Sequence, residues 1–134
     1  MAYQIKRNHV VEELEIEDNG QKHIFTVDIN VDEIIKKYNA ANYKIAAAQE
    51  NAKKARDEKD MQAAEEALGE AVLSLFSVIF GEEQTQKIIE IYENRAFEML
   101  ADIAPFIADV VGPKIQEAQA RIAERYRQVT KRPR

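Results

Sequence analysis

Residues 73–112 are dense in large apolar side chains, and this concentration most constrains what the chain can fold into. The stretch holds four of the five phenylalanines of the 134-residue sequence. Its apolar residues recur at spacings of three and four, which is typical of amphipathic helices. We therefore expect residues 73–112 to form the packed centre of the fold, with the other segments attached to it.

Glycine and proline divide this centre into helices. Gly81 stands where a helix end commonly adopts a left-handed conformation, so one helix should stop there and a short helix should follow over residues 82–93. Pro105 cannot donate to the helical ladder, and it should kink the next helix or begin a new segment. Gly112 and Pro113 are expected to end that helix and to start the last one, because proline suits a first helical turn.

An Asn-Gly pair at Asn19 and Gly20 predicts a β-hairpin near the N-terminus. Apolar and polar residues alternate with a period of two on both sides of it, and both turn residues accept the positive φ that a two-residue hairpin loop requires. We place the strands at residues 11–17 and 22–29. Residues 3–6 alternate as well, which leaves a third short strand open.

A hairpin of two strands is marginally stable by itself, so one face must rest on helices or on another subunit. We favour packing on the helices of the same chain, and strand addition by a partner at an unpaired edge is the alternative. Five acidic residues lie on or next to the first strand: Glu12, Glu13, Glu15, Glu17 and Asp18. We interpret them as a solvated face rather than a metal site, because alternation directs neighbouring carboxylates to opposite sides.

Asn30 predicts the start of the first long helix, since its side chain can cap the helix and Glu33 completes a variant of the capping box. Beyond it, apolar residues with polar interruptions form a narrow heptad-like seam. The seam comprises Ile35, Tyr38, Asn42, Ile45, Gln49 and Ala52. We favour a break near Asp60 that folds residues 32–58 back against residues 61–80; a single long projecting helix is the alternative.

No catalytic chemistry is evident in the sequence. The chain has no cysteine, which excludes disulfides, thiolate catalysis and cysteine-built zinc sites. His9 and His23 lack metal-ligand spacing, and there is no phosphate-binding glycine loop, HExxH motif or EF-hand loop. Ser74 and Ser77 lie in an apolar helical stripe without an evident base. We therefore predict a protein that is not an enzyme, with no catalytic, cofactor-binding or metal site.

The charge distribution argues against a general role with nucleic acids, and the hydropathy argues against a membrane span. The net charge is −5, from 19 basic and 24 acidic residues, whereas phosphate binding depends on clustered cations. Residues 114–134 carry seven basic and two acidic residues, which we interpret as favourable charge at a helix C-terminus rather than a nucleic-acid tail. No signal-peptide run is present at the N-terminus, and no apolar stretch reaches the roughly 18 residues of a membrane span.

These patterns together predict an α+β fold in which an N-terminal β-hairpin precedes a mostly α-helical body of four or five helices. We expect one domain over residues 1–134. It divides into a β-hairpin region at residues 1–30, a helical body at residues 31–130 and a basic tail at residues 131–134.

Four short segments of the helical centre carry a resemblance to a known family. They read FGEE at residues 80–83, KIIEIYE at 87–93, ML at 99–100 and PFI at 105–107. This pattern resembles the helical part of tail assembly chaperones of long-tailed phages and prophages, chiefly of Gram-positive hosts. The preceding hairpin followed by a helix is similar to that family in layout.

The resemblance implies that the chain binds the long, hydrophobic, helix-rich tape measure protein, or another helical phage tail protein, before the tail tube forms. It implies that the chain keeps this client soluble in the cytoplasm of the bacterial host, and it allows copies of the chain to form a homo-oligomer. A structural or adaptor protein of phage morphogenesis is the first rival, and a nucleic-acid-associated accessory protein is the second.

The candidate partner-binding residues are the apolar residues of the helices that carry this resemblance. They are Ile88, Ile89, Tyr92, Phe97, Leu100, Phe106 and Ile107. Core packing is the alternative for each of them, because helical apolar spacing mostly marks a core. The prediction requires only that a subset remains exposed in the unbound chain.

Overall fold

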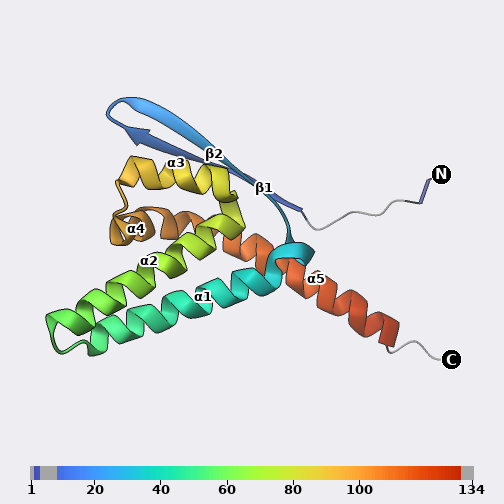
Figure 1. The fold of residues 1–134 in the computed structure, drawn as a ribbon. Coiled ribbons are helices and arrows are strands. Elements are labelled where there is room, and N and C mark those ends of the chain that lie inside the picture. The colour runs from blue at the N-terminus through green and yellow to red at the C-terminus, as the bar shows by residue number, and fades with distance from the viewer. Residues whose placement is uncertain (1, 4–8, 131–134) are drawn as a thin grey trace.

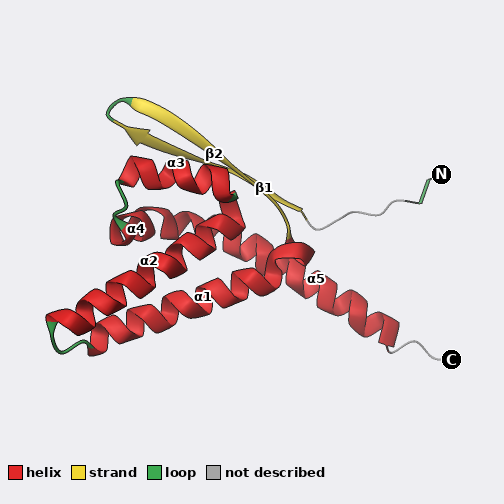
Figure 2. Ribbon diagram, viewed as in Figure 1, coloured by secondary structure: helices red, strands yellow, loops and turns green. Residues whose placement is uncertain are grey.

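The computed structural model describes residues 2–3 and 9–130, which form a β-hairpin followed by a helical body (Figure 1). The order is β1 (His9–Asp18), β2 (Gln21–Asn30), α1 (Val31–Lys54), α2 (Glu58–Phe80), α3 (Glu82–Tyr92), α4 (Ala96–Phe106), the π-helical segment η1 (Ile107–Val111) and α5 (Gly112–Thr130). Helices dominate the described part of the chain, and short loops connect them (Figure 2). The predicted α+β fold class is confirmed.

The hairpin forms where the Asn-Gly pair predicts it. Asn19 and Gly20 both have positive φ, 51° and 79°, and Asp18 pairs with Gln21 across the turn. The described residues contain one antiparallel sheet of these two strands. Most of the third strand considered at residues 3–6 lies outside the described residues, as does the basic tail.

One face of the hairpin supplies part of the core. Phe25, Val27 and Ile29 alternate along β2 and are at most 7% exposed. They share the central core cluster with residues of α1, α2 and η1, and β2 packs mainly on α2. Burial of this face provides the support that a two-stranded hairpin requires, so the prediction that it rests on its own helices holds.

The side chain of Gln84 joins the hairpin to two helices. Its Oε1 accepts a hydrogen bond from the Thr26 backbone N–H at 2.8 Å, and its Nε2 donates to the Thr26 carbonyl at 2.7 Å. The same Nε2 donates to the Phe80 carbonyl, also at 2.7 Å, at the end of α2. The Gln84 amide therefore bonds to β2 as the backbone of an adjacent strand would. It also supplies a donor to the Phe80 carbonyl, which has no intrahelical partner at the end of α2.

The two long helices form an antiparallel pair, as expected. Asn30 caps α1 by accepting a hydrogen bond from the Asp32 N–H at 3.0 Å. The chain reverses at residues 55–57, slightly before the predicted break, and Asp57 caps α2 by accepting from the Asp60 N–H at 2.8 Å. Contact between α1 and α2 is the most extensive between any two helices described.

Gly81 ends α2 and directly precedes α3, but its conformation differs from the expectation. Its φ of 81° is positive, as a glycine stop requires, yet its ψ of 161° lies outside the left-handed helical region. This combination is essentially restricted to glycine, and it turns the chain sharply between two helices. The Gly81 carbonyl then accepts both the backbone N–H and the hydroxyl of Thr85, which is 3% exposed.

A new helix begins at Gly112, as expected, but no loop separates it from the helix before it, because α4, η1 and α5 follow one another directly. Pro105 lies inside α4, and the Gly112 N–H bonds to the Ile107 carbonyl five residues earlier, which is the π-helical pattern. Gly112 itself has helical angles of −56° and −49°. Gly112 packs closely against α1, because a β-carbon added there would lie 3.3 Å from the Tyr38 hydroxyl.

Only the first half of α5 packs on the body. Ile115 and Ala118 are at most 1% exposed, whereas Tyr126 and Val129 on the same stripe are more than 70% exposed. Figure 1 shows α5 extending away from the other helices toward its C-terminal end. The predicted amphipathic stripe is therefore present; Ile122 still packs against the core, whereas Tyr126 and Val129 beyond it are exposed.

Replacing either of two helical glycines with alanine should have opposite effects on stability. Gly69→Ala should raise the free energy of unfolding by about 0.5–1 kcal/mol, because its new methyl group would lie 3.8 Å from the Ala96 Cβ, an ordinary contact. Gly112→Ala should lower it by about 1–3 kcal/mol, because the methyl group would lie 2.8 Å from the Ile107 carbonyl oxygen. Urea unfolding measures both, and equal effects would contradict this account of Gly112.

Gln84→Glu should destabilise the fold by about 2 kcal/mol, because a carboxylate has no N–H to offer to the Thr26 and Phe80 carbonyls. Gln86→Glu is the matched control, since Gln86 lies exposed on the same helix and the change adds the same charge. Chemical unfolding of the two variants gives the comparison. Equal stability of the two would show that the amide of Gln84 contributes nothing specific.

Candidate partner-binding groove

The heptad-like seam of α1 faces a groove. Tyr38, Asn42, Ile45 and Gln49 line one side of it, at the alternating three- and four-residue spacing that places them along one face of α1. Tyr38 and Ile45 are buried, whereas Asn42 and Gln49 are exposed. The polar interruptions of the seam therefore form a rim, and its apolar residues form part of a floor.

The continuous helix of α4, η1 and α5 forms the opposite side. Leu100 and Ala104 belong to α4, and both are half-buried. The remaining lining residues on this side come from η1 and the start of α5: Ile107, Ala108, Gly112, Pro113 and Gln116. Leu75 of α2, which is 3% exposed, closes the floor between the two sides.

The groove contains no charged side chain. All twelve residues that line its volume of about 400 Å³ are apolar or neutral. Its exposed rim carries three polar side chains, the amides of Asn42, Gln49 and Gln116. The only other polar group among the lining side chains is the hydroxyl of the buried Tyr38. In a sequence that is 32% charged, this is a surface on which an apolar partner could be desolvated without burying an ion.

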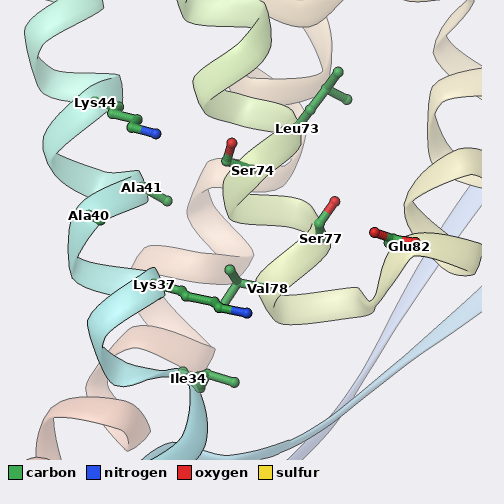
Figure 3. A pocket seen from close by; sticks show the side chains of 10 residues that line it. All are labelled: Ile34, Lys37, Ala40, Ala41, Lys44, Leu73, Ser74, Ser77, Val78 and Glu82. Atoms are coloured by element: carbon green, nitrogen blue, oxygen red, sulfur yellow. The ribbon is translucent and has the colours of Figure 1, made fainter.

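Four other depressions described on the surface all carry charge. The one shown in Figure 3, of about 600 Å³, lies along α1 and α2 and reaches the start of α3. Lys37 and Lys44 extend from α1 toward α2 in this view, and Glu82 faces Ser77. These charged side chains keep their hydration in water, so this larger depression is a poorer match for an apolar partner.

Three of the seven predicted partner-binding residues are associated with the uncharged groove. Leu100 and Ile107 line it, with Ile107 at the floor and 6% exposed. Phe97 lies three residues before Leu100, one helical turn along the same side of α4, and is 49% exposed. Part of the predicted set therefore lies along one side of α4 and its continuation into η1.

The other four predicted residues have different surroundings. Ile88 is fully buried in the core, so it offers no surface in the unbound chain. Phe106 is half-buried, and its ring stacks on Phe80 with a centroid distance of 6.3 Å. Ile89 is half-buried and lines a separate, acidic depression with Glu82 and other residues of α2 and α3.

Tyr92 connects α3 to α4. Its hydroxyl donates a hydrogen bond of 2.9 Å to the Asp102 carboxylate, and the residue is 9% exposed. Burial raises the pKa of the Tyr92 phenol above its ordinary value of 10.0, and the hydrogen bond to Asp102 raises it further. The phenol therefore remains a neutral donor at physiological pH, which suits a structural contact.

The sequence carries a signal for each side of the groove, but none that the two sides lie together. The spacing predicts the seam of α1, and Leu100 and Ile107 are candidate partner-binding residues, but nothing local connects the seam with residues 100–116, which lie more than fifty positions further along the chain. Ala104, Ala108 and Gln116 have no sequence signal as partner-binding residues. Small or polar residues indicate a binding surface only when the fold places them beside an apolar floor.

Within residues 2–3 and 9–130, histidine, cysteine, aspartate and glutamate do not gather into a group that could hold a metal ion. None of the helices in that part of the chain combines the length and hydropathy of a membrane-crossing segment.

Comparison with known proteins adds no relative to these observations. No protein-family model matches the chain, and no curated protein or solved structure matches it. The resemblance to tail assembly chaperones consequently rests on the sequence pattern itself.

Tyr92→Phe should lower the free energy of unfolding by about 1 kcal/mol at pH 7, because it removes the hydrogen bond to Asp102. The raised pKa adds a pH dependence. Above pH 10 the unfolded tyrosine loses its proton while the folded one retains it, so wild-type stability falls as the pH rises. The difference between wild type and variant should therefore shrink above pH 10, and a constant difference in urea unfolding would contradict this linkage.

Proposed function

We propose that this protein is a phage tail assembly chaperone that holds an apolar helical segment of the tape measure protein in the uncharged groove. The activity is non-enzymatic, and it takes place in the cytoplasm of the bacterial host. The observation that carries the proposal is the groove between α1 and α4–α5, in which none of the twelve lining residues is charged.

The groove has the features that an amphipathic helix requires of its binding site. An apolar floor of Ile45, Leu75 and Ile107 can receive side chains spaced at one face of a client helix. The amides of Asn42, Gln49 and Gln116 stand on both sides of it and can bond to polar groups at the edge of that face. Half-buried Leu100 and exposed Phe97 continue the apolar surface along α4.

The rest of the surface suits a protein that keeps such a client in solution. The net charge of −5 and the 32% charged content leave the faces away from the groove strongly hydrated. A holding chaperone needs both properties, since it must cover apolar client surface and remain soluble while it does so. The tape measure protein, as the resemblance describes it, is long, hydrophobic and rich in helices.

A structural adaptor is the second candidate, because the same groove could hold a helix permanently. The two functions differ in the fate of the protein. A chaperone leaves when the tail tube replaces it, whereas an adaptor remains with its partner. Quantifying the chain in purified tails by mass spectrometry separates them: the chaperone should be absent, and a stoichiometric amount would favour the adaptor.

Co-expression with a tape measure fragment tests the proposal directly. The fragment should move from the pellet to the soluble fraction when the wild-type chain is present, and it should copurify with the chain. Precipitation of the fragment at equal expression of the chain would refute the chaperone function for that client.

Charge placed in the groove should weaken the binding of the tape measure fragment. Gln49→Glu combined with Gln116→Glu keeps the side-chain shapes but adds two carboxylates to the rim, and client affinity should fall about tenfold or more. Gln62→Glu combined with Gln86→Glu is the matched control, since both residues are exposed outside the groove and the added charge is identical. Equal client binding by the two variants, both folded by circular dichroism, would remove the groove from the mechanism.

A further inference from the structure

The two edges of the hairpin are not equivalent. At β2, the Thr26 N–H and carbonyl both bond to Gln84 and therefore point away from β1. Thr26 lies opposite Glu13, so this is a pair without mutual backbone hydrogen bonds. The alternation of antiparallel pairing then directs the backbone groups of every second residue of β1, including Glu13, Glu15 and Glu17, away from β2.

That outer edge of β1 is open. Within residues 2–3 and 9–130, no backbone or side-chain hydrogen bond from another element reaches the backbone of β1 on this side. The strand is ten residues long, and it offers a regular series of donors and acceptors. Such an edge is a template for an additional strand, whereas Gln84 already occupies the centre of the other edge.

The inner face of the hairpin is also incomplete beside this edge. Leu14 lies directly opposite Phe25, yet Phe25 is 3% exposed while Leu14 is half-buried. Ile16, two residues further along, is half-buried as well. An added strand would place its own inward side chains next to these two residues and would complete the apolar layer.

The outer, solvent-facing side of the hairpin indicates which charge an added strand should carry. Glu13 lies opposite Thr26 and Glu15 lies opposite Ile24, so neither carboxylate has a cation across the existing pair. A strand added at the open edge would bring its outward side chains within about 4.5–5.5 Å of these positions. Lysine or arginine there would be favourable, whereas the glutamates of a second copy of β1 would repel them.

We propose that the open edge of β1 binds an extended segment of another protein whose side chains alternate between apolar and basic. The apolar side chains pack beside Leu14 and Ile16, the basic ones meet Glu13 and Glu15, and the main chain extends the sheet to three strands. This surface is separate from the uncharged groove, since none of the residues of β1 lines the groove. The proposal therefore does not depend on the identity of the groove's client.

The test uses capped peptides of about nine residues, enough to pair along residues 11–17 of β1. One alternates valine and lysine, a second has the same composition in scrambled order, and a third replaces lysine with glutamate. The alternating basic peptide should bind at least tenfold more tightly than the other two, measured by fluorescence anisotropy. Its main shifts in amide NMR spectra should fall on residues 11–17. Equal binding of the scrambled peptide would reduce the effect to net charge and overturn the proposal.

Two variants locate the contact. Glu13→Pro removes an N–H that points outward, so it should abolish peptide binding while the β1–β2 ladder remains intact. Glu13→Lys combined with Glu15→Lys should reverse the preference, so that the glutamate peptide binds at least tenfold more tightly than the lysine peptide. This second variant keeps the test decisive if Glu13→Pro fails to fold. Unchanged preference in the double variant would overturn the proposal.

The groove variant and the oligomeric state provide the remaining controls. Gln49→Glu combined with Gln116→Glu should bind the alternating basic peptide like the wild type, and a loss of binding would place the peptide in the groove instead. In sedimentation, the wild type and the Glu13→Pro variant should show the same degree of self-association. Self-association that disappears in that variant would assign the open edge to a second copy of the chain and reject the proposal.

Discussion

The fold depends on burying one face of a hairpin that cannot be stable by itself. Phe25, Val27 and Ile29 form that face, and residues of the helices pack over it in the same core cluster. The amide of Gln84 positions the helices relative to the hairpin. It belongs to α3 and bonds both to β2 and to the end of α2. A hydrophobic contact alone would tolerate sliding of the strand over the helices, whereas three directional bonds from one side chain define its position.

The same arrangement separates two kinds of surface. The helical body presents a neutral groove on the side of α1, α4 and α5, and the hairpin presents a strand edge beside a row of carboxylates. A helix can satisfy its own backbone and needs only a place for its apolar face, so the groove suits a partner that is already folded. An edge strand offers backbone bonds, so it suits a partner that arrives extended. Under the two proposals above, the chain would discriminate between partners by their secondary structure.

Local sequence signals predicted the hairpin, the capping of α1 by Asn30 and the reversal between α1 and α2, because each depends on a few neighbouring residues. The role of Gln84 could not be predicted, since one glutamine in an amphipathic helix has no local signature and its partners lie 58 positions away. Residues on both sides of the groove were predictable, but their proximity was not, because the two sides come from distant segments. At Gly112 and Pro113 the predicted helix boundary is present, but the π turn that joins the helices there without a loop has no local signature in the sequence.

The π turn also sets the rotational phase of the last helix. Ile103, Ile107, Val111 and Ile115 are all buried, although each step of four residues in an α-helix rotates the side chain by about 40° beyond a full turn. Three such steps would carry Ile115 about 120° away from the core. The wider turn at η1 absorbs much of this drift, so the buried residues of α4 and α5 remain in one core cluster. A deletion of one residue there would leave both helices intact in content but would rotate Gln116 and Pro113 out of line with Leu100 and Ala104, and the wall of the groove would no longer be continuous.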